Sequence, residues 1–218
     1  MKALIFDMDG VIIDSERYYE KVDRIWFQQH HVRIDWDRFH QSLGTTEAVM
    51  VDLIRSWNPD LEWEKVLQEY HEHCQQNDLD YRTLYRPYVT ELLDQCHRQG
   101  IRTALASSSS IDNIRQVLYQ CGISESFDLI VSGEDFTSSK PDPEIFLYCA
   151  RRMKLEASDC VVIEDSVNGV LAAKRAGMKV IGLYDPYFDL DLSAADLLIT
   201  DLECLEIREN QIQKRSDL

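Results

Sequence analysis

Four groups of polar side chains stand beside short apolar segments of this chain, where they could carry out chemistry. Asp7 and Asp9 follow the apolar residues 2–6 and precede Gly10. The other groups are Ser107 after residues 102–106, Lys140 before Pro141, and Glu164-Asp165 after residues 160–163. Ligands of open α/β sheets bind outside the carboxyl ends of the strands. A nucleophile, a hydroxyl, a cation and a second acid pair therefore predict one phosphoryl-transfer site.

The first acid pair suits two-step displacement at phosphorus. Asp7 can attack phosphorus and form an aspartyl-phosphate. Asp9 lies on the same side of an extended chain and can act first as general acid and later as general base. Neighbouring carboxylates raise each other's proton affinity, which helps Asp9 carry a proton near neutral pH. A turn of the type Asp-x-Asp-Gly, without chemistry, explains this motif alone equally well.

The second acid pair suits a metal ion. Glu164 and Asp165 offer hard oxygen ligands, which Mg2+ prefers. The metal would offset the repulsion between Asp7 and a phosphate dianion and polarise the phosphate oxygens. The structural alternative is that Asp165 or Ser166 caps the helix that follows.

Two further groups could hold the phosphoryl group. Ser107 and Ser108 begin a run of four serines between a predicted strand and a predicted helix, where hydroxyls and backbone N–H groups can bind an anion. Lys140, held extended by Pro141, would neutralise charge in the transition state. The alternatives are an ordinary serine-capped loop and a solvated surface lysine.

Strands and helices alternate from residue 86 onward. Apolar strands are predicted at residues 2–6, 101–106, 129–131, 160–163, 179–183 and 197–199. Amphipathic helices separate them, and Gly100, Gly122 and Gly177 are placed to end three of these helices. This pattern predicts an α/β fold with a parallel sheet covered by helices on both faces. The polar tail after Gln211 is expected to fray.

Residues 15–85 have helical spacing and no convincing strand. Apolar faces are predicted on three helices, within residues 18–29, 49–57 and 63–74. All four tryptophans lie in this stretch. It therefore reads as a helical insertion with its own aromatic core.

Composition excludes several kinds of partner. The 218 residues carry a formal net charge of −16, which disfavours nucleic acid and anionic membranes as partners. No apolar run approaches membrane-spanning length, and the first residues do not resemble a signal peptide. The six cysteines form no C-x-x-C pair and are expected to be reduced thiols of a cytoplasmic protein. His71 and His73 face different sides of a helix, which argues against zinc. The acidic surface favours a monomer.

The motifs in their order resemble the haloacid dehalogenase superfamily of phosphohydrolases, over essentially the whole chain. They are Asp7-Met8-Asp9-Gly10-Val11, Ser107, Lys140-Pro141 and Glu164-Asp165-Ser166. The helical insertion is similar to the C1-type cap of the β-phosphoglucomutase-like branch. The resemblance implies a Rossmann-like core at residues 1–14 and 86–218 and a mobile cap at residues 15–85.

The resemblance also implies roles for the site residues. Asp7 would be the nucleophile and Asp9 the acid and base. Mg2+ would be held by Asp7, the Asp9 carbonyl and Asp165, with support from Glu164. Ser107 and Lys140 would hold the phosphoryl group.

Three cap positions depart from the mutases of this branch, which carry a histidine, a lysine and an arginine there. Aligned through Asp14 and Gly44, this chain has Tyr19, Leu43 and Glu47. Cations that would bind a second phosphate are therefore missing, which favours hydrolysis. We expect a Mg2+-dependent phosphatase of a small phosphorylated metabolite such as a sugar phosphate, with a sugar-phosphate mutase as the alternative. A dehalogenase fits the acids less well, and a non-catalytic binding module is disfavoured because no catalytic position is replaced.

Overall fold

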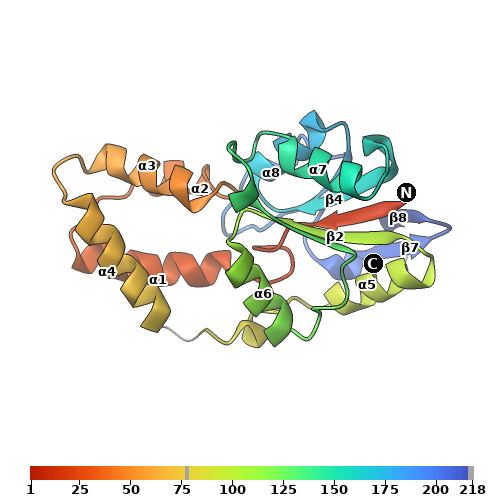
Figure 1. The fold of residues 1–218 in the computed structure, drawn as a ribbon, viewed down its shortest axis with the longest axis horizontal. Helices are drawn as coiled ribbons and strands as arrows, with labels where there is room; N and C mark the ends of the chain where they lie inside the picture. Colours follow the sequence, from red (N-terminus) through yellow and green to blue (C-terminus); the bar gives the residue numbers. More distant parts are fainter. Residues whose placement is uncertain (77–78, 216–218) are drawn as a thin grey trace.

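The structure is a computed structural model that describes residues 1–76 and 79–215. Its centre is a parallel sheet of six strands in the order β3-β2-β1-β4-β5-β6 (Figure 1). The strands are β1 (Ala3–Phe6), β2 (Arg102–Ser107), β3 (Leu129–Ser132), β4 (Cys160–Glu164), β5 (Lys179–Leu183) and β6 (Leu197–Ile199). All six expected strands are present, and the α/β, Rossmann-like fold class is confirmed.

Helices cover both faces of the sheet, which explains why its strands are mostly apolar. The helices are α5 (Val89–Arg98), α6 (Ile111–Gln120), α7 (Glu144–Arg152) and α8 (Val167–Arg175). Leu4 and Phe6 of β1 join one apolar cluster with α5 and α6. Ala3 and Ile5 join a second cluster with α7 and α8, because successive side chains of a strand point to opposite faces. Short 3₁₀ turns at Gly133–Asp135, Ala157–Asp159 and Leu202–Cys204 complete the connections.

The segment between β1 and α5 is helical. It contains α1 (Glu16–Gln29), α2 (Trp36–His40), α3 (Glu47–Trp57), α4 (Trp63–Gln76) and a 3₁₀ turn at Tyr81–Thr83. Helices α1 to α4 lie beyond one end of the sheet (Figure 1). They share an apolar cluster of their own, which includes Trp26, Phe27, Phe39, Ile54 and Trp63.

The expected buried faces of this segment need correction. Ile25 and Val49 belong to the apolar faces predicted within residues 18–29 and 49–57, but they are 53% and 42% exposed. Glu20 and Asp23 are buried on α1 instead. Both have polar partners: Glu20 accepts hydrogen bonds from Arg24 and His40, and Asp23 accepts one from Tyr70. A carboxylate with such partners can be buried at an acceptable free-energy cost.

Residues 211–214 form a strand, whereas fraying is expected for the tail after Gln211; residues 216–218 of that tail lie outside the described residues. Strands β7 (Leu205–Arg208) and β8 (Gln211–Lys214) form an antiparallel hairpin. Leu205 and Ile207 are buried, and the Gln99 side chain of the segment after α5 donates a hydrogen bond to the Ile207 carbonyl. Packing against α5 therefore fixes a segment whose sequence is mostly polar. None of the described helices combines the length and apolar character needed to cross a membrane.

Candidate active site

The candidate residues meet at the carboxyl end of the central strands. Asp7 follows β1, Ser107 ends β2 and Glu164 ends β4. β1 lies between β2 and β4, so these three positions are neighbours. The sheet topology thus brings together groups that are far apart in sequence, as the motif positions predict.

Lys140 lies at the centre of this group and is buried, with 3% of its surface exposed. Its Nζ donates to Asp7 Oδ1 at 2.6 Å and to Glu164 Oε1 at 2.7 Å. The Ala106 carbonyl accepts a third hydrogen bond at 3.3 Å. Burial works against the ammonium form, but the two carboxylates outweigh it and raise the pKa of Lys140. Lys140 is therefore a buried cation rather than a solvated surface lysine.

Both carboxylate oxygens of Glu164 accept hydrogen bonds from other groups of the protein. Oε1 accepts from Lys140, and Oε2 accepts from the Asp165 and Ser166 backbone N–H groups and from Ser166 Oγ. A Cβ atom on Gly169 would lie 1.7 Å from Glu164 Oε1, so the close approach of α8 requires glycine. Ser166 Oγ accepts from the Gly169 N–H, which means that Ser166 is the helix cap that the sequence left open.

Three carboxylates form a candidate metal centre. Asp7, Glu164 and Asp165 each present an oxygen within 4.8 Å of the others. Asp165 lies against Gly10, whose φ is +75° and whose Cβ, if present, would be 1.8 Å from Asp165 Oδ2. Both the steric space and the backbone conformation therefore demand glycine at this position.

The electrostatics of this cluster favour a cation. Burial, with the charge of Glu164, raises the pKa of Asp165 well above its usual range. Burial likewise raises the pKa of Asp7 to about 8, despite the opposing effect of Lys140. One ammonium thus does not balance the buried acids, and hard carboxylate oxygens are the ligands that Mg2+ takes. The donor set fits Mg2+.

The Asp9 side chain is not part of that cluster and is held by two hydroxyls. Ser15 Oγ donates to Asp9 Oδ1, and Ser109 Oγ donates to Asp9 Oδ2, each at 2.7 Å. Burial raises the pKa of Asp9, while these hydrogen bonds lower it in part. Neither Ser15 nor Ser109 is part of a predicted motif position, although Ser109 lies inside the serine run.

The serines of the run 107–110 form hydrogen bonds with different parts of the structure. Ser107 Oγ is buried and accepts from the Ser109 backbone N–H at 3.0 Å. Ser108 Oγ donates to the Gly44 carbonyl of the helical segment at 2.8 Å. Ser110 caps α6 by accepting from the Asn113 N–H. The loop therefore places a helix N-terminus beside Asp9 and joins it to residues 15–85.

The helical segment contacts the edge of the site at several points. Asn168 Nδ2 donates to the Gln41 and Leu43 carbonyls at 2.8 and 2.9 Å. The Thr46 N–H donates to Ser139 Oγ at 2.8 Å. On the other side, Arg17 pairs with Asp185. The segment is thus held against the carboxyl end of the sheet by polar contacts.

The three positions that depart from the mutases carry neutral or acidic side chains. Tyr19 Oη lies 3.2 Å from Tyr81 Oη. Leu43 is buried. Glu47 accepts a hydrogen bond from His71 Nε2 at 2.6 Å. None of these side chains offers a cation to a second phosphate.

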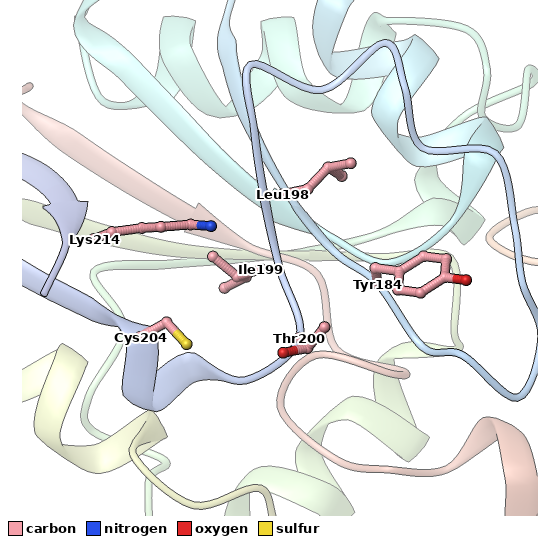
Figure 2. Close-up of a pocket in the computed structure, with 6 residues that line it drawn as sticks. All are labelled: Tyr184, Leu198, Ile199, Thr200, Cys204 and Lys214. Carbon is pink, nitrogen blue, oxygen red and sulfur yellow. The ribbon is translucent and has the colours of Figure 1, made fainter. Parts of the chain in front are cut away.

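A surface cavity of about 260 Å³ lies elsewhere, at the free edge of β6 (Figure 2). Its lining residues are Tyr184, Leu198, Ile199, Thr200, Cys204 and Lys214. Figure 2 shows Lys214 extending from the hairpin toward Ile199. None of the candidate site residues lines this cavity.

Comparison with known proteins places the chain in a family. Residues 1–177 match the haloacid dehalogenase-like hydrolases. The chain belongs to this family. Hexitol phosphatase B of Escherichia coli (strain K12) is 32% identical, over 90% of this chain and 96% of that protein. The bifunctional riboflavin kinase/FMN phosphatase of Arabidopsis thaliana is 48% identical to this chain. The match covers 83% of this chain and 48% of that protein.

The fold agrees with a solved member of the β-phosphoglucomutase group. The crystal structure of β-phosphoglucomutase from Clostridium difficile has a TM-score of 0.77 and 27% identity, and the match covers 93% of this chain and 92% of that one. The resemblance stated from the motifs is confirmed. With phosphatases among its relatives, this haloacid dehalogenase-like hydrolase is a phosphatase-type enzyme.

Proposed function

We propose that this chain is a Mg2+-dependent phosphatase that releases phosphate from a small phosphorylated metabolite, a sugar phosphate, through an aspartyl-phosphate on Asp7. The observation that carries the proposal is the buried group of Asp7, Lys140 and Glu164, with Asp165 beside it and Asp9 two residues from the nucleophile. The similarity to hexitol phosphatase B supports the substrate class.

The chain's own residues can carry both steps of the reaction. An Asp7 carboxylate oxygen attacks phosphorus, and the bond from phosphorus to the leaving oxygen breaks while Asp9 gives that oxygen its proton. Asp9 then takes a proton from water as the water attacks the aspartyl-phosphate, which frees phosphate and restores Asp7. Lys140, together with Ser107 and Ser108, stabilises the charge on the phosphoryl oxygens.

Asp7, Asp165 and the Asp9 carbonyl would hold Mg2+, with Glu164 in support. Mg2+ when bound offsets the repulsion between Asp7 and the phosphate dianion and polarises the phosphoryl oxygens. Because both oxygens of Glu164 already bind Lys140 and the Asp165–Ser166 backbone, its support consists of orienting these neighbours.

Residues 15–85 act as a cap over a core of residues 1–14 and 86–218. The polar contacts of the segment Gln41–Thr46 with Asn168, Ser108 and Ser139 can break and re-form without exposing a large apolar surface. Opening admits substrate, and closure controls access of water. Hydrolysis is favoured over mutase chemistry because Tyr19, Leu43 and Glu47 provide no cation for a second phosphate.

The cysteines support a reducing, cytoplasmic location. All six are free thiols, and Cys96, Cys149 and Cys160 are buried. We also propose that the protein is a monomer, because its acidic surface disfavours association with a second copy.

A panel of phosphorylated metabolites tests the proposed function. Inorganic phosphate and isomerised product would be measured with Mg2+ and after its removal by a chelator. The proposal predicts Mg2+-dependent phosphate release from sugar monophosphates. Isomerisation of β-glucose 1-phosphate with little free phosphate would establish the mutase alternative instead.

A further inference from the structure

The loop that follows β5 contacts the helical segment near the start of α1. Asp185 of this loop accepts two hydrogen bonds from Arg17, from Nε at 2.8 Å and from Nη2. The Tyr187 N–H also donates to Asp185 at 2.8 Å, which orients the carboxylate. Tyr187 Oη donates to Glu20 Oε1 of α1 at 3.3 Å. The ion pair of Arg17 and Asp185 therefore joins residues 15–85 to the sheet and its helices.

A second ion pair bridges the two connections between the helical segment and the rest of the chain. These connections run side by side, because the Asp14 N–H donates to the Leu84 carbonyl at 2.7 Å and the Arg86 N–H donates to the Ile12 carbonyl at 2.9 Å. Arg86 Nη2 donates to Asp14 Oδ1 at 3.0 Å. The two ion pairs thus lie at the same end of the segment, three residues apart along the chain from Asp14 to Arg17.

Each of the two arginines is close to both aspartates. Arg17 interacts electrostatically with Asp14 as well as with Asp185. Arg86 interacts with Asp185 as well as with its partner Asp14. Two cations and two anions therefore share one region, and they can pair in two ways.

Arg86 has a hydrogen-bond donor that the present pairing does not use. Its Nε is buried and has no acceptor among the described residues. A buried donor without a partner is unfavourable, and a carboxylate that reached it would remove this cost. Asp185 carries such a carboxylate, but Arg17 occupies both of its oxygens in this structure. Asp165, which also interacts with Arg86, belongs to the candidate metal centre.

We infer that these four residues form an ion-pair switch between the helical segment and the core. With the segment against the core, Arg17 pairs with Asp185 and Arg86 pairs with Asp14. When the segment moves away, Arg17 moves with it and pairs with Asp14, while Asp185 is released to Arg86. The inference rests on the proposed function, in which residues 15–85 act as a cap. Each arrangement holds two ion pairs, so opening leaves no charge unpaired and the two states stay close in free energy.

Two double variants that share one substitution test the switch. Arg17→Gln with Asp14→Asn removes both pairs of the closed arrangement but only one of the open arrangement. Arg17→Gln with Asp185→Asn removes both pairs of the open arrangement but only one of the closed arrangement. Hydrogen exchange of the Thr46 N–H, which donates to Ser139 Oγ of the core at 2.8 Å, reports opening without substrate. We expect exchange about fivefold faster than wild type in the first variant and about fivefold slower in the second.

Two controls separate opening of the segment from other changes. The Leu92 N–H, which donates to the Tyr88 carbonyl at the start of α5, reports opening of the core and should exchange at the wild-type rate in both variants. Lys65→Gln with Glu69→Gln removes an exposed ion pair of α4 and should leave the exchange of Thr46 unchanged. These controls show whether an effect on Thr46 belongs to the four residues of the switch.

Equal acceleration of Thr46 exchange in both double variants would overturn the inference, because Arg17 and Asp185 would then be a clamp without alternative partners. No change in either variant would overturn it as well. If a variant also accelerates the exchange of Leu92, the wild-type protein decides. The switch predicts that sodium chloride changes Thr46 exchange little, because both states hold two ion pairs, whereas a lone clamp predicts a marked acceleration at high salt.

These measurements are independent of catalysis. Absence of phosphate release by the wild-type protein from any sugar monophosphate would contradict the proposed function. The exchange rates of Thr46 would still show whether the four residues exchange partners.

Discussion

Lys140 is buried and doubly paired, whereas most lysines of proteins are exposed to solvent. It connects a carboxylate that follows β1 with one that ends β4, and almost no solvent reaches it. A buried charge is tolerated only when it is paired, so the three side chains depend on one another. Under the proposed function, the same arrangement would also present a positive charge to a phosphoryl group.

Replacement of Lys140 by methionine should therefore damage stability as well as activity. The change leaves Asp7 and Glu164 buried without their cation, and the free energy of unfolding should fall by about 3 kcal/mol. Urea denaturation of the variant and of the wild-type protein would measure this fall in the free energy of unfolding. As a control, Lys174→Met breaks the exposed pair with Asp196 and should cost less than about 1 kcal/mol. Equal costs for the two variants would contradict the structural role of Lys140.

Asp9 should matter most when the leaving group needs a proton. Asp9→Asn removes the general acid, so kcat for an alkyl phosphate such as sorbitol 6-phosphate should fall about 100-fold or more. The first turnover of p-nitrophenyl phosphate should fall far less, because nitrophenolate leaves without protonation. Rapid-mixing measurements of both substrates would compare them. An equal loss for the two would show that Asp9 is not the acid.

At the residue scale, sequence motifs predict which functional side chains meet, but they do not predict which other residues form hydrogen bonds with them. Asp7, Ser107 and Glu164 follow from their positions at strand ends, whereas Lys140 lies in the connection between β3 and α7 and is marked only by the proline that follows it. Ser109, which binds Asp9, lies 100 residues from it in sequence. Such a contact depends on side-chain geometry at the sheet edge, which motif spacing does not encode.

Helices and strands with a clear apolar pattern can be predicted from the sequence, whereas short or polar helices and strands cannot. Strands β1, β4 and β5 stand out as nearly continuous apolar runs because both of their faces are buried. Helix α2 has five residues, too few for a helical period to show. Strand β8 reads QIQK, and only its pairing with β7 and the packing of the hairpin on α5 make it a strand.

Inside the helical segment of residues 15–85, Asp23 should make stability depend on pH. Burial raises its pKa from 3.8 to about 6, although Tyr70 donates a hydrogen bond to it. The folded state therefore favours the protonated form, and stability is lost as pH rises from about 4 through 6. The loss is on the order of 3 kcal/mol.

Asp23→Asn should remove this dependence. The amide oxygen can still accept from Tyr70, and no ionisation is possible. Denaturation between pH 4 and pH 8 should show the variant gaining stability over the wild-type protein as pH rises. A constant difference between the two proteins across that range would refute the assignment.

At the scale of the whole molecule, excess negative charge links metal binding to stability. The chain has a formal net charge of −16, and at the site the buried carboxyl groups of Asp7 and Glu164 outnumber the ammonium of Lys140. Mg2+ that binds only the folded state stabilises it, by about 2.7 kcal/mol at a hundredfold excess over Kd. The melting temperature should therefore rise with Mg2+ and fall again with a chelator.

Asp165→Ala should largely abolish that rise, since it removes one of the proposed ligands. Glu64→Gln, an exposed acid of α4, should keep it and so controls for a general effect of negative charge. A melting shift in Asp165→Ala that equals the wild-type shift would exclude Asp165 as a ligand.

The most direct test of the central claim is phosphate release from sorbitol 6-phosphate in the presence of Mg2+, by the wild-type protein and by Asp7→Asn. The amide of asparagine is a poor nucleophile, so the account predicts steady release by the wild-type protein and none above background by the variant. Release by Asp7→Asn at the wild-type rate would contradict an aspartyl-phosphate on Asp7.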